Sequence, residues 1–182
     1  MRKTVALLLL TCSLHGFAYE KIDLNRGWIF NEKQTVNVPH DYLIEQPWVA
    51  PGTDEKADNS DAGANIKSRL SARGFKELEN GTYTKTFTPS ADLKGKKLLL
   101  DFEGILYVAD VYLNGTLIGG TDYGYVGFEI DVTKELKLGE ENTIKVVCGQ
   151  GNPKNSRWYT GGGLYRNVSL IAKDAQLHFN RH

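Results

Sequence analysis

The sequence predicts an all-β protein, built as an antiparallel β-sandwich or jelly roll, and three observations support this prediction. Apolar residues alternate with polar ones over several short stretches in the second half of the chain. The pair Asn114-Gly115 is the strongest two-residue signal for a β-hairpin. Glycines, 19 in all, separate the apolar stretches at the short spacing that sandwiches and jelly rolls show.

Each expected strand follows a period-two pattern, in which every second side chain faces the core. The first of these strands contains Tyr83, Lys85 and Phe87, and it ends before Pro89. The following strands are expected to have these apolar faces: Leu98, Leu100 and Phe102; Tyr107, Ala109, Val111 and Leu113; Phe128, Ile130 and Val132; Ile144, Val146 and Cys148. The last long strand is expected over residues 164–171. Residues 133–136 look helical, but they are enough for one turn at most.

Residues 1–18 have the pattern of a signal peptide, which predicts export to the periplasm or the extracellular space. Arg2 and Lys3 precede an apolar run over residues 5–14, and Gly16-Phe17-Ala18 resembles a cleavage site. The run is too short for the roughly 20 residues that a membrane-spanning helix needs. A lipoprotein anchor at Cys12 is a weaker alternative, because Thr11 is a poor residue before a lipidated cysteine.

Composition argues against a nucleic-acid-binding function and against an intrachain disulfide in the mature chain. The chain has 22 basic and 22 acidic residues, so it lacks the basic excess expected of a nucleic-acid-binding protein. Without the signal peptide only Cys148 remains, and no intrachain disulfide can form. Because Cys148 is in phase with Ile144 and Val146, we expect it to be buried. Residues 19–173 have the size of one domain.

Residues 49–80 are expected to form a long loop, since most of them are polar and show no periodicity. Four side chains in this loop have oxygen atoms that could bind calcium: Asp54, Asp58, Asn59 and Asp61. Their spacing does not match a calcium loop, in which ligands alternate around a central glycine. We therefore expect a solvated loop there, and no metal-ligand spacing or cofactor motif is found elsewhere.

Three stretches resemble conserved segments of family 2 glycoside hydrolases. Residues 36–42, read VNVPHDY, resemble the segment VPHDW of that family. Residues 109–115, read ADVYLNG, resemble its A-x-V-x-L-N-G hairpin. Residues 156–168, read SRWYTGGGLYRNV, are similar to SRWYPGAGIYRNV, although Thr160 and Gly162 stand where that pattern has proline and alanine. These matches occur in the order of the family and cover nearly the whole mature chain.

This resemblance implies a galactose-binding-like jelly roll at the start of a β-galactosidase-type enzyme. An immunoglobulin-like sandwich and a barrel with two catalytic glutamates follow in that family, so residues 174–182 are expected to begin the connection to a second domain. Retaining hydrolysis needs two carboxylates about 5–5.5 Å apart. The sequence offers no such pair, because Glu103 and Glu129 are expected to be solvent-facing strand residues. We therefore expect this chain to be non-catalytic.

The candidate sugar-binding residues are Arg157, Trp158, Tyr159 and Asp41. Sugar recognition combines a flat apolar face with fixed polar groups, and residues 157–159 provide a guanidinium, an indole and a phenol on one loop. By resemblance this loop faces the active site of the barrel. Alternatively, Trp158 and Tyr159 pack the end of the sandwich while Arg157 binds a carboxylate. Asp41 likewise has the alternative role of a turn or capping residue.

Two further residues are assigned structural roles. His40 next to Asp41 suggests catalysis, but the sequence has no serine-elbow or cysteine context to support a nucleophile. Arg166 is expected in the strand behind the loop. Three functions remain open: a non-catalytic part of a secreted glycosidase that acts on a β-galactoside-like glycan, a free-standing carbohydrate-binding module, and a truncated product without activity of its own.

Overall fold

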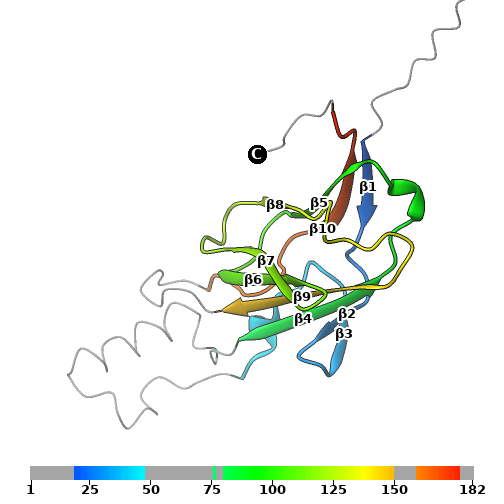
Figure 1. The fold of residues 1–182 in the computed structure, drawn as a ribbon. Coiled ribbons are helices and arrows are strands. Elements are labelled where there is room, and N and C mark those ends of the chain that lie inside the picture. Colours follow the sequence, from blue (N-terminus) through cyan, green and yellow to red (C-terminus); the bar gives the residue numbers. More distant parts are fainter. Residues whose placement is uncertain (1–18, 48–75, 77–79, 150–158, 177–182) are drawn as a thin grey trace, which may run out of the picture.

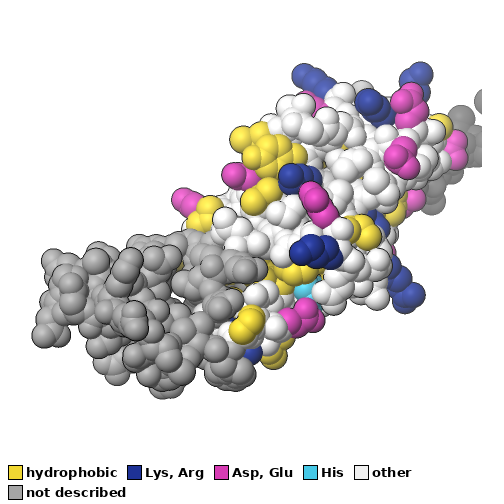
Figure 2. Space-filling view, turned by 90° about the horizontal axis from the view of Figure 1, so that it is seen from below, with side chains coloured by type: hydrophobic (Ala, Val, Ile, Leu, Met, Phe, Trp, Pro, Cys, Tyr) yellow, Lys and Arg dark blue, Asp and Glu magenta, His cyan; other side chains and the backbone are white. Residues whose placement is uncertain are grey.

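A computed structural model describes residues 19–47, 76, 80–149 and 159–176. Over these residues the chain forms two antiparallel β-sheets, with two 3-10 turns beside them, so the all-β prediction is confirmed (Figure 1). The described residues include no helix long and apolar enough to cross a membrane. Lysine or arginine and aspartate or glutamate side chains are interspersed on the face shown in Figure 2, in keeping with a net charge of zero.

The smaller sheet has four strands in the spatial order β1-β10-β5-β8. Its strands are β1 (Glu20–Asp23), β10 (Val168–Lys173), β5 (Lys97–Phe102) and β8 (Phe128–Asp131). The first and last strands of the described chain are therefore hydrogen-bonded neighbours, with Glu20 opposite Ala172. The two central strands, β5 and β10, are almost completely buried on both faces.

The larger sheet has six strands in the spatial order β3-β2-β4-β9-β6-β7. Its strands are β3 (Gln34–Val36), β2 (Trp28–Phe30), β4 (Gly81–Phe87), β9 (Asn142–Gly149), β6 (Val108–Leu113) and β7 (Thr116–Thr121). The 3-10 turns are η1 (Tyr42–Glu45) and η2 (Ala91–Leu93).

Apolar side chains from both sheets form one hydrophobic core. Alternate residues of β9 point into it, and Cys148 among them is completely buried, as its phase predicts. Trp28 is fully buried, and its indole N–H donates to the carbonyl of Leu24 at 2.7 Å. This bond satisfies the one polar group of the indole, so the ring is buried without leaving an unpaired donor.

The predicted strands agree with the structure, with differences at their ends. The Asn114-Gly115 turn joins β6 to β7, and both residues have the positive φ angles of a hairpin turn, 51° and 85°. The last strand begins at Val168 rather than Leu164, because Gly163 forms a bridge to Leu106 instead. Most of the expected connection to a second domain, residues 174–182, and most of loop 49–80 lie outside the described residues.

Four connections gather at one end of the sandwich, the end toward which β9 points in Figure 1. They comprise residues 37–47, 103–107, 122–127 and 159–167. Leu106 and Gly163 join two of them through reciprocal backbone hydrogen bonds of 2.9 and 2.8 Å. The outer ends of β1 and β10 lie at the opposite end of the smaller sheet. Two of the four predicted site residues, Asp41 and Tyr159, lie in the gathered connections.

Candidate functional site

The carboxylate of Asp41 lies at the centre of the candidate site and accepts three hydrogen bonds. The hydroxyl of Tyr159 donates to Oδ2 at 2.6 Å. The backbone N–H of Gly162 donates to Oδ1 at 2.9 Å, and that of Leu43 donates to the same oxygen at 3.1 Å. Asp41 therefore joins two stretches of chain 118 residues apart, the same two stretches that resemble VPHDW and SRWYPGAG.

Asp41 is the N-cap of η1, and this role helps to fix the position of its carboxylate. Its backbone is extended (φ −108°, ψ 93°), and its side chain accepts from the N–H two residues further on. A capping carboxylate satisfies an amide that would otherwise lack a partner at the start of the turn. The far end of η1 is held by Lys76, whose buried ammonium donates to the carbonyls of Ile44 and Gln46 at 3.0 and 2.8 Å.

Buried aromatic residues support the segment just before Asp41. The N–H of His40 donates to the carbonyl of Leu164 at 2.7 Å, and the hydroxyl of Tyr83 lies 2.8 Å from Nδ1 of His40. Phe30 packs against both rings, with ring centroids 5.2 Å from His40 and 4.9 Å from Tyr83. Burial raises the pKa of the Tyr83 hydroxyl well above its usual range, so it stays protonated.

His40 does not form a catalytic pair with Asp41. Its Nε2 atom is buried and lies 3.8 Å from Oε1 of Glu45, beyond hydrogen-bond distance. The carboxylate of Asp41 is instead bonded to Tyr159 and two backbone amides. The structural role expected for His40 therefore agrees with the geometry.

The glycines after Tyr159 let the chain approach Asp41 and Tyr83 closely. Gly161 has φ of 80°, and a Cβ atom there would lie 2.9 Å from Oδ2 of Asp41. Gly163 has φ of 98°, and a Cβ atom there would clash with the hydroxyl of Tyr83. Both positions therefore require glycine, for space and for backbone conformation. The tight packing holds this part of the loop against the 37–47 connection.

Tyr159 presents part of its ring to solvent while its hydroxyl is held. The residue is 41% exposed, and its hydroxyl is bonded to Asp41. Burial, and then the hydrogen bond and negative charge of Asp41, raise the pKa of Tyr159 above its usual range. An exposed ring with a fixed hydroxyl can pack on the apolar face of a ligand. The partly exposed ring of Tyr159 therefore does more than pack the end of the sandwich. The alternative role given for Asp41, that of a capping residue, is found in the structure.

The structure brings Asp41 and Tyr159 together, whereas Arg157 and Trp158 lie outside the described residues. Two residues that support the site, Tyr83 and Lys76, were not predicted from the sequence to do so. The apolar phase of β4 predicted that Tyr83 is buried, but no local pattern indicates that its hydroxyl reaches His40. Arg166 lies just before β10, where it is exposed and its guanidinium lies 5.1 Å from the ring centroid of Tyr165.

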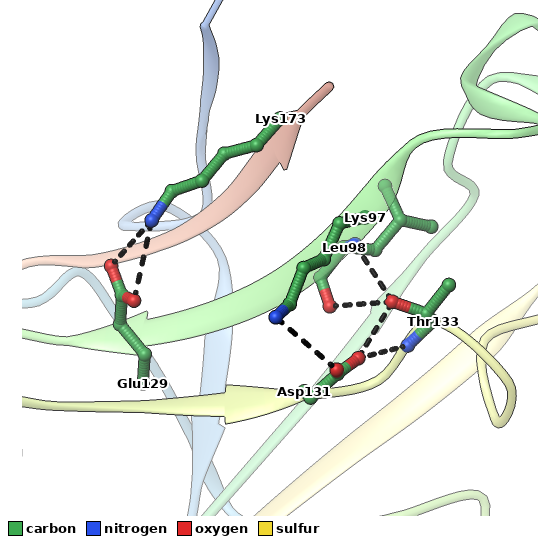
Figure 3. Close-up of polar contacts among 6 residues, drawn as sticks. All are labelled: Lys97, Leu98, Glu129, Asp131, Thr133 and Lys173. Carbon is green, nitrogen blue, oxygen red and sulfur yellow. Dashed lines mark hydrogen bonds and ion pairs between the residues drawn. The ribbon is translucent and has the colours of Figure 1, made fainter. Parts of the chain in front are cut away.

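Glu103 and Glu129 both have structural partners, and the solvent-facing prediction for Glu129 is wrong. Glu129 is 12% exposed, and both of its oxygens lie 3.4 Å from Nζ of Lys173 (Figure 3). The register of β10, β5 and β8 places Lys173 and Glu129 on the same face of the sheet, on either side of β5. Glu103 is partly exposed and pairs with Lys21 at 3.0 Å.

Asp131 and Thr133 form a second polar contact at the end of β8. Asp131 accepts from both the N–H and the hydroxyl of Thr133, and its carboxylate lies 3.9 Å from Nζ of Lys97 (Figure 3). Burial opposes ionisation of Asp131, but the bonds from Thr133 and the nearby lysine outweigh it and lower its pKa. Among the described residues, no group of three or more histidine, cysteine, aspartate or glutamate side chains could hold a metal.

Comparison with known proteins decides the family. Residues 68–174, more than half of the chain, match the family described as glycosyl hydrolase 2 galactose-binding domain-like. The chain belongs to glycoside hydrolase family 2. Its two sheets are those of a galactose-binding-like domain, as the resemblance in the sequence implies.

Relatives within family 2 are much longer than this chain. It is 30% identical over 176 residues to the β-galactosidase BoGH2A of Bacteroides ovatus, covering 87% of this chain and 19% of that protein. It is 28% identical over 180 residues to a β-glucuronidase of Bacteroides fragilis, covering 92% of this chain and 23% of the relative. The chain thus spans about a fifth of the length of these curated relatives.

Solved structures of family 2 proteins contain the same fold. A β-glycosidase from Bacteroides vulgatus matches with a TM-score of 0.69 at 29% identity, over 85% of this chain and 20% of that one. A family 2 member from Bacteroides cellulosilyticus matches with a TM-score of 0.67 at 31% identity, over 84% of this chain and 20% of that one. The chain therefore has the architecture of one domain within these larger proteins.

Proposed function

We propose that this chain is the carbohydrate-recognition domain of an exported, retaining β-galactosidase-type glycosidase, and that it does not hydrolyse glycosides by itself. In this proposal Asp41 and Tyr159, together with Arg157 and Trp158, line one side of a sugar pocket. The observation that carries the proposal is the 2.6 Å hydrogen bond from Tyr159 to Asp41. It joins the two stretches that resemble conserved family segments, and it leaves the tyrosine ring partly exposed.

The geometry suits a pyranose ring. The exposed face of Tyr159 can pack against the C–H face of a sugar, and its hydroxyl is already held by Asp41. A carboxylate has about four lone-pair sites, and three bonds to Asp41 are described. One site therefore remains for a sugar hydroxyl. Because the loop is held by Gly161 and Gly163, little conformational entropy is lost when the sugar binds.

The choice of ligand rests on the relatives. One is a β-galactosidase and another is a β-glucuronidase, and the matching family model is named for galactose binding. We favour a β-galactoside because the matching family model is described as galactose-binding domain-like. Since the chain spans about a fifth of those enzymes, the catalytic carboxylates are assigned to other domains of a parent glycosidase.

Binding of methyl β-galactoside to the purified chain, followed by NMR, tests the recognition part of the proposal. We expect a dissociation constant on the order of 1 mM, because one side of a pocket leaves much of the sugar in water. Tyr159→Ala should abolish the shifts of residues near Asp41. The matched variant Tyr159→Phe keeps the ring but loses the bond to Asp41, so it should retain part of the binding.

Three results would contradict the proposal. Hydrolysis of an aryl β-galactoside by the purified chain, abolished by one glutamate or aspartate substitution, would show that the chain is itself an enzyme. Micromolar affinity for an oligosaccharide, lost in Trp158→Ala, would favour a free-standing binding module. Absence of any galactoside-dependent shift near Asp41 at tens of millimolar, well above the expected dissociation constant, would remove Asp41 and Tyr159 from the site.

A further inference from the structure

A second group of aromatic side chains is exposed at the same end of the sandwich. Tyr123 and Tyr125 lie in the connection between β7 and β8, and these two residues are 55% and 52% exposed. Their ring centroids are 5.7 Å apart with an interplanar angle of 64°. Tyr107, from the connection between β5 and β6, meets Tyr125 edge to face at 6.4 Å and 86°. These three residues are called the tyrosine surface below.

The backbone beneath the tyrosine surface is fixed. The hydroxyl of Tyr165 donates to the carbonyl of Gly124 at 2.9 Å, and Thr121 bonds both the N–H and the carbonyl of Tyr123. Gly124 packs so closely on the adjoining connection that a Cβ atom there would lie 2.5 Å from the side chain of Leu106. The rings are therefore presented by a rigid loop, which lowers the entropy lost on binding.

Folding does not account for the exposure of these rings. Neither Tyr123 nor Tyr125 belongs to the hydrophobic core, and about half of each side chain faces solvent. Because an aromatic side chain buries about 150–250 Å² when covered, the two together expose on the order of 200 Å². The adjoining Val126 is 49% exposed and, being smaller, adds less than either ring. This exposed area is a few times less than the roughly 800 Å² per partner of a stable protein interface. The surface matches a small ligand better than a protein.

The side chains within this loop favour a neutral ligand over an anionic one. Residues 121–127 contain one acidic side chain, Asp122, and no basic one, so a carboxylate or sulfate would find no counter-ion within this loop. Burial, and then contact with Tyr107, raise the pKa of Tyr125, which keeps this hydroxyl uncharged as a donor and acceptor. Inclined rings with hydroxyls at their edges suit the apolar faces and the hydroxyls of sugar rings.

We infer that the tyrosine surface is a second carbohydrate-binding site, which takes a neutral oligosaccharide through stacking on Tyr123 and Tyr125. It is distinct from the Asp41–Tyr159 site, because none of its side chains contributes to the hydrogen bonds of Asp41. The bridge between Leu106 and Gly163 joins the connection that holds Tyr107 to the one that holds Tyr159. Both sites therefore lie at the loop end of the sandwich, where one glycan chain of several sugar rings could contact them in turn.

NMR titration of the 182-residue chain carrying Tyr159→Ala tests this inference independently of the Asp41–Tyr159 site. The probe is β-1,4-galactotetraose, and the readout is the ring resonances of Tyr123 and Tyr125. We expect saturable shifts with a dissociation constant on the order of 1 mM. Adding Tyr125→Ala should weaken binding at least about tenfold, as expected when one stacked ring is lost. Tyr125→Phe, which keeps the ring, should change affinity by less than about threefold.

Controls make each outcome decisive. Leu117→Ala removes an equally exposed apolar side chain from β7 and should leave the affinity unchanged. Tetragalacturonate, the acidic counterpart of the probe, should not shift the tyrosine rings. The inference is wrong if galactotetraose causes no saturable shift of these rings at 10 mM, roughly ten times the expected dissociation constant. It is also wrong if Tyr125→Ala leaves the affinity unchanged, or if the surface instead mediates self-association that Tyr125→Ala abolishes in sedimentation.

Discussion

Two groups of aromatic residues lie at the loop end of the sandwich, and they differ in exposure rather than in ring geometry. In the buried group, Phe30 has centroid distances of 4.9–5.3 Å to His40, Tyr42 and Tyr83. In the tyrosine surface the corresponding distances are 5.7 and 6.4 Å. Both ranges are ordinary for aromatic pairs. Ring contacts alone therefore do not distinguish a structural cluster from a recognition surface.

The hydroxyl groups separate the two groups further. Tyr83 is fully buried, and its hydroxyl is bonded within the chain to His40. Tyr42 packs against Gly81 and Gly162, so it fills space between the two connections. These residues keep Asp41 in place, whereas Tyr123 and Tyr125 support nothing in the core. The buried group therefore supports the candidate site, whereas the exposed group is available to a ligand.

Replacing one tyrosine from each group is expected to give the largest difference in the free energy of unfolding. Tyr83→Ala should lower the free energy of unfolding by about 3–5 kcal/mol, because it leaves a large cavity among buried rings. Tyr123→Ala should lower it by no more than about 0.5 kcal/mol, since the ring is half exposed. Urea unfolding followed by circular dichroism measures both. Similar losses in the two variants would mean that exposure does not separate the groups.

Removing the Asp41 carboxylate should lower the free energy of unfolding by an intermediate amount. Asp41→Ala deprives Tyr159 and two backbone amides of their acceptor and removes the cap of η1. We expect a loss of about 1–2 kcal/mol in urea unfolding, the usual cost of a lost N-cap or hydrogen bond. Asp41→Asn, which keeps an acceptor oxygen, should lose less. The matched control Asp122→Ala, an exposed aspartate of the β7–β8 connection, should change stability by less than about 0.5 kcal/mol.

The sequence predicted those features of the fold that depend on near neighbours. The alternation through Ile144, Val146 and Cys148 indicated which side chains are buried, and Asn114-Gly115 located a hairpin. The prediction for Glu129 was wrong, because alternation assigns a residue to a face but does not show what covers that face. The partner of Glu129 is Lys173, which is 44 residues away in the sequence and is brought close by the strand order β10-β5-β8.

The sequence predicted Asp41 and Tyr159 individually as site residues, but it did not predict the contact between them. Asp41 and Tyr159 were both chosen from motifs, yet nothing in either motif indicated that they share a hydrogen bond across 118 residues. That contact depends on how two connections fold against the core, and on Gly161 allowing their close approach. The tyrosine surface was missed for the same reason, since Tyr107 and Tyr125 come from different connections.

The smallest expected effect is a shift in the alkaline titration of Tyr159, which tests whether Asp41 holds its hydroxyl. The pKa of Tyr159 is raised in the folded chain, first by burial and then by Asp41. A raised folded pKa stabilises the fold fully below the unfolded pKa of about 10, and this contribution is lost as pH rises through the folded pKa. Tyr159 should thus stay protonated at about pH 10–11, where an ordinary tyrosine ionises.

Phenolate absorbance of the folded chain measures this titration. Wild type and Tyr159→Phe should give the same absorbance up to about pH 11, because Tyr159 does not contribute phenolate there. In Asp41→Ala the hydrogen bond and the negative charge are gone while much of the burial remains. The pKa of Tyr159 should then fall toward its ordinary value without reaching it. If Tyr159 already ionises near pH 10 in the wild-type chain, its hydroxyl is not bonded to Asp41 in solution. The exposed ring would then lose the fixed orientation on which the proposed sugar contact depends.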